Sequence, residues 1–254
     1  MITQATPTAA SSSVQERITY RAFVQAMAMI HIANNRKEKS PGDPKVGGHP
    51  ASCASAMHIL AALHLDVRHP NDFVCCKPHA SPVDHAFHHL MQFFQTADGT
   101  WLDEAQAARA MHRLRDFPDD PATSPPNPDD QVFQSYHART DPDSFHFLPS
   151  GSVGIPQVVS VYLALAHRYA LDHGWVVPAN THFWSLMGDS EFREGSVLEC
   201  MPDVSERRLG NVTWIVDYNR QNLDGTRIPN KRGLRGSDAD RIERTAVANG
   251  WDVI

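Results

Sequence analysis

Apolar and polar positions follow a regular order along this 254-residue chain and predict helices and strands in turn. Apolar residues recur at helical intervals over 17–35 and 50–65, which indicates amphipathic helices. Short apolar runs at 71–76, 181–187 and 212–218 are typical of buried strands. Further helices are expected over 82–94 and 154–173. This alternation predicts an α/β fold, a doubly wound and mostly parallel sheet with helices on both faces.

The pattern predicts one domain over 15–254, preceded by a disordered lead at 1–14 that is rich in Thr, Ala and Ser. Segment 113–150 is rich in Pro and Asp and exceeds an ordinary connection, so we expect a lid or a disordered loop there. Near the end, Ser237 and Asp240 have the spacing of a capping box, and Gly250 is a typical helix stop. Residues 251–254 are expected to begin another strand.

Composition narrows the classes of partner and compartment. The formal net charge is −6 and the isoelectric point is about 6.2, whereas nucleic acids and anionic membranes both require a basic face. Hydrophobic residues make up 41% of the chain, enough for a substantial core, and no apolar run reaches the ~18 residues of a membrane span. The four cysteines show no paired spacing and the first residues have no signal-peptide pattern, so we expect a cytoplasmic protein.

Polar residues follow two of the predicted strands at the point where each strand ends. Asp189 comes after the strand at 181–187, and Asn219 follows the strand at 212–218. The carboxyl ends of parallel strands meet at one edge of the sheet, where open α/β folds bind ligands. A carboxylate, an amide oxygen and the backbone carbonyl of Gln221 are oxygen ligands of the kind that Mg2+ prefers. The pattern therefore predicts a combined metal and diphosphate site.

This motif and its flanks resemble a known family. A Gly-Asp-Gly sequence followed at a distance by Asn marks thiamine diphosphate enzymes of the transketolase superfamily. The flanks are most similar to the N-terminal, diphosphate-binding domain of the homodimeric bacterial pyruvate dehydrogenase first component. The resemblance covers residues 15 to 254. Six blocks carry it in the family's order, namely Gly47–Ser52, His79–Pro82, Ser152–Gly154, Gly188–Glu191, Asn219–Gly225 and Gly250–Ile254.

The resemblance implies thiamine diphosphate and Mg2+ as cofactors. It also implies an enzyme acting on a 2-oxo acid or ketose, either a pyruvate dehydrogenase-like 2-oxo acid dehydrogenase or a transketolase, with pyruvate as the family's substrate. His49 and His79 are implied to face the reacting centre, where imidazoles that titrate near neutrality suit proton exchange. The implied cofactor-binding residues are Ser52, Gly188, Asp189, Ser190, Glu191, Asn219, Gln221 and Leu223, of which Asp189, Asn219 and Gln221 bind the metal.

In the family this domain continues beyond the equivalent of residue 254, and a second domain carries the glutamate that engages the pyrimidine ring. The chain therefore resembles a C-terminally shortened piece. We expect it to act as a split subunit in an oligomer, with a second chain carrying the pyrimidine-binding domain. The alternative is a catalytically silent truncated homologue that serves as an interaction module. A neighbouring gene that encodes the missing domain would favour the first hypothesis.

Several residues depart from the family's pattern. Ser190 replaces the second glycine of the Gly-Asp-Gly motif, so its hydroxymethyl group either obstructs the diphosphate or donates to it. Lys77 and Pro78 stand where relatives have glutamine and glycine, and Pro156 replaces another glycine. Lys77 adds a charge that either favours an anionic or phosphorylated substrate or reaches solvent.

Simpler interpretations exist for the candidate residues. Asp189 and Asn219 are residue types that also favour ordinary turns after strands. The two histidines of the candidate site can be structural, His49 by packing at a helix start and His79 within the fold. Glu194 is either a solvated charge or, by resemblance to transketolases, a residue near a dimer interface.

A zinc site is another interpretation of the segment around residue 80. Possible nitrogen and sulfur ligands gather there, namely Cys75, Cys76, His79, His85, His88 and His89. However, the adjacent cysteines are expected to point to opposite faces of a strand. His85 with His88 or His89 is expected to form one exposed side of a helix. The sequence therefore favours the thiamine diphosphate site over a zinc site.

Overall fold

The computed structural model describes residues 9–36, 48–116, 131–134, 136–145, 148, 151–221 and 237–254. Its three-stranded parallel sheet has the order β1-β2-β3. The strands are β1 (Phe73–Cys75), β2 (Phe183–Gly188) and β3 (Val212–Asp217). All three lie where the apolar runs predict strands.

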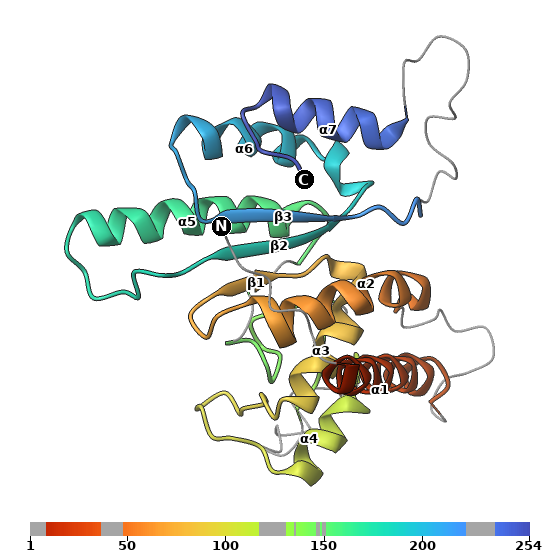
Figure 1. The fold of residues 1–254 in the computed structure, drawn as a ribbon. Helices are drawn as coiled ribbons and strands as arrows, with labels where there is room; N and C mark the ends of the chain where they lie inside the picture. Colours follow the sequence, from red (N-terminus) through yellow and green to blue (C-terminus); the bar gives the residue numbers. More distant parts are fainter. Residues whose placement is uncertain are drawn as a thin grey trace.

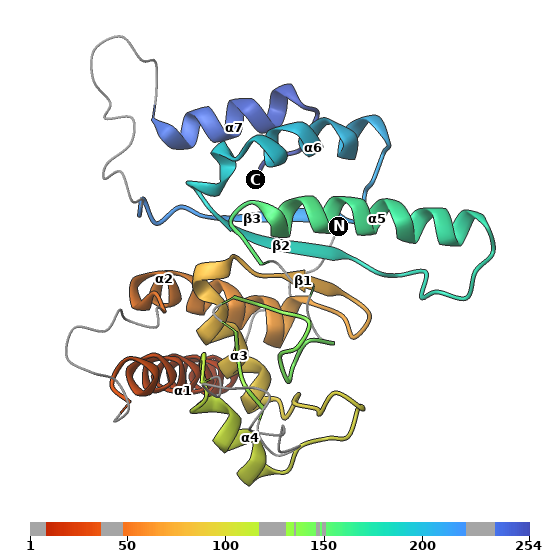
Figure 2. The ribbon, with the colours of Figure 1, turned by 180° about the vertical axis from the view of Figure 1, so that it is seen from behind.

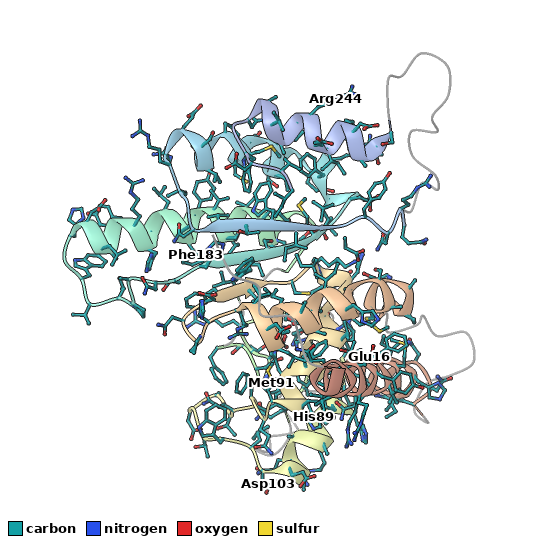
Figure 3. All side chains as sticks on the ribbon, viewed as in Figure 1. Glu16, His89, Met91, Asp103, Phe183 and Arg244 are labelled. Atoms are coloured by element: carbon teal, nitrogen blue, oxygen red, sulfur yellow. The ribbon has the colours of Figure 1, made fainter. Side chains whose placement is uncertain are left out.

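Helices cover both faces of this sheet (Figures 1 and 2). They are α1 (Ala9–Asn34), α2 (Pro50–Ala62), α3 (Ser81–Leu90), α4 (Glu104–Met111), α5 (Ile155–Asp172), α6 (Gly195–Glu206) and α7 (Asp238–Ala248). Alternate strand residues point to opposite faces. Leu186 and Ile215 pack into the core shared with α1, α2 and α3, whereas Phe183 and Trp214 pack with residues of α5 and α6. Side chains fill both layers (Figure 3). The predicted α/β fold is thus confirmed.

Two of the predicted helix ends have the expected local chemistry. The Ser237 hydroxyl accepts a hydrogen bond from the Asp240 backbone N–H, and the Asp240 carboxylate accepts from the Ser237 N–H, so the capping box that starts α7 is confirmed. Gly250 follows α7 with φ of +79°, in the left-handed region that favours glycine.

The chain ends differ from the sequence prediction. Helix α1 already begins at Ala9, so the disordered lead predicted for 1–14 is wrong from residue 9 onward, and residues 1–8 lie outside the described part. A nucleated helix extends readily through alanines because each added residue gains a hydrogen bond. The predicted strand at 251–254 is also wrong. Trp251 instead packs on Trp214 and donates its indole N–H to the Met201 carbonyl at 2.9 Å.

The segment predicted as a lid contains buried structure. Residues 117–130 lie outside the described part, but Phe133, His137, Asp141 and Asp143 are all buried against the rest of the molecule. Helix α4 was not predicted, although Asp103 and Gln106 form a capping box at its start. Among the described residues, no helix is long and apolar enough to cross a membrane.

Candidate functional site

The ends of β2 and β3 bring the two halves of the sequence motif together. Gly188, the last residue of β2, is the register partner of Asp217, the last residue of β3. The Asp189 N–H donates to the Asp217 carbonyl at 3.3 Å. Asn219 lies two residues beyond β3, so it lines the same pocket as Asp189 at the carboxyl edge of the sheet, where ligands of open α/β folds bind.

A pocket of about 480 Å3 opens at this edge. The start of α2 and the turn after β1 lie at the same side of the sheet and contribute further residues to its lining. Its lining includes nine of the residues singled out from the sequence, namely His49, Ser52, His79, Gly188, Asp189, Ser190, Glu191, Asn219 and Gln221. Leu223, the remaining one, lies outside the described residues.

Asp189 has the features of a cation ligand. Its side chain is 4% exposed, and Oδ1 has no hydrogen-bond partner among the described residues. Burial raises the pKa of this carboxyl, although the backbone N–H groups of Ser190 and Asp189 donate to it. A buried carboxylate oxygen without a donor is stabilised by a positive ligand. The residues present therefore fit a hard cation such as Mg2+.

The turn after β3 presents further oxygen atoms. Arg220 adopts φ of +57°, and the Gln221 N–H donates to Asn219 Oδ1 at 2.9 Å, so the turn is closed by the asparagine side chain. The Ser190 hydroxyl donates to the Gln221 carbonyl at 3.3 Å. The departure at Ser190 thus adds a hydrogen bond between the two halves of the motif, and each oxygen keeps a second lone pair.

The two histidines of the candidate site lie against each other, with ring centroids 4.0 Å apart. His49 caps the start of α2, and His79 lies in the short 3-10 turn Pro78–Ala80. Burial, His49 and Lys77 lower the pKa of His79 to about 4, and burial and Lys77 also lower the pKa of His49. The sequence prediction that both rings titrate near neutrality is therefore wrong for His79. At pH 7 this imidazole is neutral.

A first prediction concerns this lowered pKa. In a histidine NMR titration, we expect the His79 ring to show its inflection at about pH 4 and none between about pH 6 and 8. Its folded pKa lies below its unfolded value, so the stability that depends on the neutral ring is present above about pH 6.5 and is lost as the pH falls through 4. His49→Asn should move the inflection upward. An inflection near 6.5 in the wild-type chain would contradict the prediction.

Lys77 lines the pocket without reaching solvent, so the solvent interpretation is wrong and the substrate interpretation stays a prediction. Its ammonium group forms an ion pair with Asp217 Oδ2, and the side chains are only 3% and 6% exposed. The Ser55 hydroxyl donates to the same oxygen at 2.6 Å, and the Asn219 amide donates to Ser55 Oγ at 3.0 Å. The ion pair therefore links the segment after β1 to the end of β3, beside Asn219. Reasoning from the sequence missed Asp217, although it stands at the predicted end of β3.

Two glutamates border the pocket. Glu191 is buried, accepts a hydrogen bond from the Gln157 amide at 3.3 Å, and has its pKa raised to about 7 by burial. Glu194 is exposed at the start of α6. The aliphatic part of Glu194 lies beside Gly154. A Cβ atom at position 154 would come within 2.8 Å of Glu194, so glycine at this position leaves room for the Glu194 side chain.

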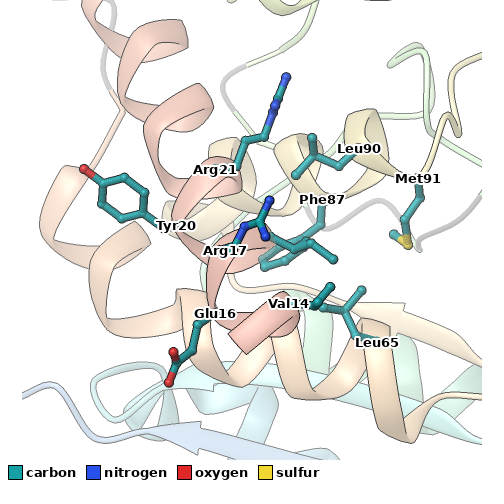
Figure 4. A pocket seen from close by; sticks show the side chains of 10 residues that line it. Val14, Glu16, Arg17, Tyr20, Arg21, Leu65, Phe87, Leu90 and Met91 are labelled. Carbon is teal, nitrogen blue, oxygen red and sulfur yellow. The ribbon is translucent and has the colours of Figure 1, made fainter. Parts of the chain in front are cut away.

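A second hollow, of about 810 Å3, lies between α1 and α3 (Figure 4). Phe87, Leu65 and Leu90 contribute apolar surface, and Arg17 and Arg21 project from α1. It contains none of the residues that the motif singles out. The pocket at the strand ends is therefore the candidate functional site.

The zinc interpretation needs a correction. His85 and His88 are completely buried, so the prediction that they form an exposed side of α3 is wrong. His89 is half-buried and its Nδ1 lies 3.2 Å from Gln25 Oε1. Neither Cys75 nor Cys76 belongs to a group of side chains that can share a metal ion, as far as the described residues show.

Known proteins resemble this chain at modest identity. It is 27% identical over 248 residues to the pyruvate dehydrogenase E1 component of Mycolicibacterium smegmatis, covering 92% of this chain and 23% of that protein. It is 29% identical over 183 residues to the transketolase of Pongo abelii, covering 68% and 24%. The E1 component of Mycobacterium tuberculosis is 27% identical over 243 residues, covering 92% and 23%.

The fold is also similar to that of a solved structure. The structure of transketolase from Leishmania mexicana matches with a TM-score of 0.59 and 16% identity, covering 91% of this chain and 31% of that one. No family model matches the chain. The chain spans about a quarter of the length of the curated relatives it matches. These similarities confirm the resemblance recognised from the sequence motifs: the chain is a homologue, at modest identity, of pyruvate dehydrogenase E1 components and transketolases.

Proposed function

We propose that the pocket binds thiamine diphosphate with Mg2+, and that the chain is the diphosphate-binding part of an enzyme acting on a 2-oxo acid or a ketose. The observation that carries the proposal is the buried Asp189 carboxylate, whose Oδ1 has no protein partner within the described part of the chain. It lies in a pocket where Asn219 and the Gln221 carbonyl supply further oxygens. The homologues are pyruvate dehydrogenase E1 components and transketolases.

In this proposal Asp189, Asn219 and the Gln221 carbonyl hold the metal. The diphosphate is bound by Ser52, Gly188, Ser190 and Glu191, together with Leu223 beyond the described residues. Ser52 lies in the first turn of α2, where backbone N–H groups and the helix dipole favour a phosphate. Ser190 and Glu191 contribute chiefly their backbone amides.

Thiamine diphosphate supplies an electron sink that stabilises negative charge on the carbon next to a former carbonyl. The chain's own residues then have to bind the cofactor and handle protons. His49 and His79 stand together at the mouth of the pocket, and lowered pKa values keep them neutral at pH 7. A neutral imidazole can accept a proton at one nitrogen and donate from the other, which suits exchange with substrate oxygens.

We further propose that a second chain completes the site. In the family a glutamate engages the pyrimidine ring. The glutamates that line this pocket are Glu191 and Glu194, and both belong to the diphosphate motif and its flank, so neither is assigned that role. A pyrimidine-binding partner would make the complex a pyruvate dehydrogenase-like or transketolase-like enzyme.

Calorimetry tests the cofactor proposal. Thiamine diphosphate should bind the wild-type chain saturably in the presence of Mg2+ and weakly without it. Asp189→Asn keeps the shape of the side chain but removes its charge, so it should abolish the metal-dependent part. Asp172→Asn, at an exposed position on α5, should leave binding unchanged. At 100 times Kd, the cofactor should stabilise the wild-type chain by about 2.7 kcal/mol.

The titrations should be repeated with the product of any neighbouring gene that encodes a pyrimidine-binding domain. Tighter binding in the mixture supports the two-chain enzyme. Binding neither alone nor in the mixture, by a chain that is folded by circular dichroism, would reject the cofactor proposal in favour of a silent homologue.

A further inference from the structure

A second cluster of titratable side chains lies outside the pocket, between α3 and the segment 136–145. Four histidines and three aspartates meet there, none of them more than 8% exposed: His64, Asp84, His85, His88, His137, Asp141 and Asp143. Charged and polar groups are rarely buried in such numbers unless they are paired or coordinate a metal. The cluster makes no contribution to the function proposed above.

Three members of the cluster face one another. Asp143 Oδ2 lies 2.7 Å from His85 Nδ1 and 2.8 Å from His88 Nδ1. His85 and His88 are separated by three residues on α3, which places them on the same side of the helix. One ligand atom from each of the three residues lies within 4.8 Å of the others. Asp143 Oδ1 has no hydrogen-bond partner among the described residues.

We propose that His85, His88 and Asp143 bind one divalent transition-metal ion, Zn2+ by the type of ligand. Two imidazole nitrogens and one carboxylate oxygen provide three donor atoms of the kinds that zinc takes, and a water molecule would complete a tetrahedral site. Zinc at ~2.0–2.1 Å from each nitrogen places neighbouring ligands roughly 3.3 Å apart. The imidazoles therefore need to move away from the carboxylate by only about half an ångström to admit the ion.

Further carboxylates surround this trio, and Asp141 has the position of a supporting contact to a proposed ligand. Asp141 Oδ2 lies 3.8 Å from His85 Nε2, the ring nitrogen that would not bind the metal. Asp84 bridges two further imidazoles, with His64 Nε2 at 2.6 Å and His137 Nε2 at 2.8 Å. Carboxylates behind metal-binding histidines fix the orientation of the rings and raise their basicity.

Charge also favours a divalent ion. The side chains of Asp84, Asp141 and Asp143 bring three carboxyl groups into the buried cluster. The Arg68 guanidinium lies 3.3 Å from His64 Nδ1, at one side of the cluster. A divalent cation beside Asp143 would offset carboxylate charge on the other side. Because protein atoms enclose the site, the ion would be structural, holding segment 136–145 against α3.

The same contacts also allow a metal-free network in which protonated imidazoles donate to Asp143. The metal content of the chain distinguishes this network from a zinc site. The full chain should be dialysed against a chelator, refilled with Zn2+ or Co2+, and measured by elemental mass spectrometry. We expect about one ion per chain, a higher Tm than in the metal-free chain, and the visible absorption of tetrahedral Co2+.

Matched variants locate the ion. Asp143→Asn keeps the volume but should lower zinc affinity by at least ~10-fold, whereas Asp189→Asn should retain the ion, which separates this site from the proposed Mg2+ site. If Asp143→Asn does not fold, His88→Gln and the wild-type Co2+ spectrum serve instead. A folded wild-type chain that takes up no stoichiometric metal, or equal uptake by Asp143→Asn, would overturn the proposal.

Discussion

Replacing Lys77 by methionine is expected to lower the free energy of unfolding by about 3 kcal/mol. Methionine fills most of the space of the lysine stem but removes the ammonium group, so the Asp217 carboxylate stays buried without its counter-ion. The hydroxyl of Ser55 still donates to Asp217 Oδ2, and the Asn219 amide does so at 3.3 Å. These two donors keep the loss at the lower end of the range for broken buried ion pairs. Urea unfolding measures it.

A double-mutant cycle separates the ion pair from simple packing. Asp217→Asn alone leaves the Lys77 ammonium buried without a charge partner and should also destabilise the chain. The double variant Lys77→Met/Asp217→Asn should lose less than the sum of the single losses, with a coupling of roughly 1 to 3 kcal/mol. Arg207→Met, which breaks an exposed pair with Asp203, should cost less than about 1 kcal/mol. If Lys77→Met also costs less than about 1 kcal/mol, the Lys77 ammonium group reaches water and the prediction is wrong.

The position of the candidate site was predictable because it depends on local patterns. Apolar runs located β2 and β3, and parallel strands necessarily end at the same edge of the sheet. Asp189 and Asn219 directly follow these strands, so their place in one pocket could be predicted without knowledge of long-range packing. The same argument could not reach Leu223, which lies outside the described residues.

The ion pair of Lys77 with Asp217 could not be predicted in this way. Its partners are 140 residues apart, and periodicity tells which face of an element a residue occupies but not which residue it meets. Lys77 was interpreted as a charge directed at substrate or solvent because lysine is seldom buried. A buried carboxylate at the neighbouring strand end is what makes its burial possible.

The buried histidines of α3 show the same limitation. A helix face rich in histidine is ordinarily solvated, so the sequence predicted an exposed side for His85 and His88. Their carboxylate partner, Asp143, comes from the segment that Pro and Asp content marked as a lid. The exposed side predicted for His85 and His88 was wrong because the described residues around Asp143 cover them.

Phe133→Ala is expected to lower the free energy of unfolding by about 3 to 5 kcal/mol, as for other large aromatic side chains removed from a core. Phe133 is fully buried, and its ring lies 4.4 Å from the His85 ring and 5.4 Å from the Phe94 ring, measured between centroids. Its backbone also accepts from the Arg115 N–H at 2.7 Å and donates to the Arg113 carbonyl at 3.1 Å. The ring therefore joins the segment after α4 to α3.

Loss of the ring should act locally as well as on global stability. The cavity would open next to His85, so amide hydrogen exchange of α3 and of residues 136–145 should accelerate more than that of β2 and β3. Phe133→Leu keeps most of the apolar volume and should cost about 1 kcal/mol, and Tyr20→Ala, at an exposed position on α1, about 0.5 kcal/mol or less. Equal losses for Phe133→Ala and Tyr20→Ala would contradict the prediction. They would show that this segment packs too loosely to shield the histidines and aspartates beneath it.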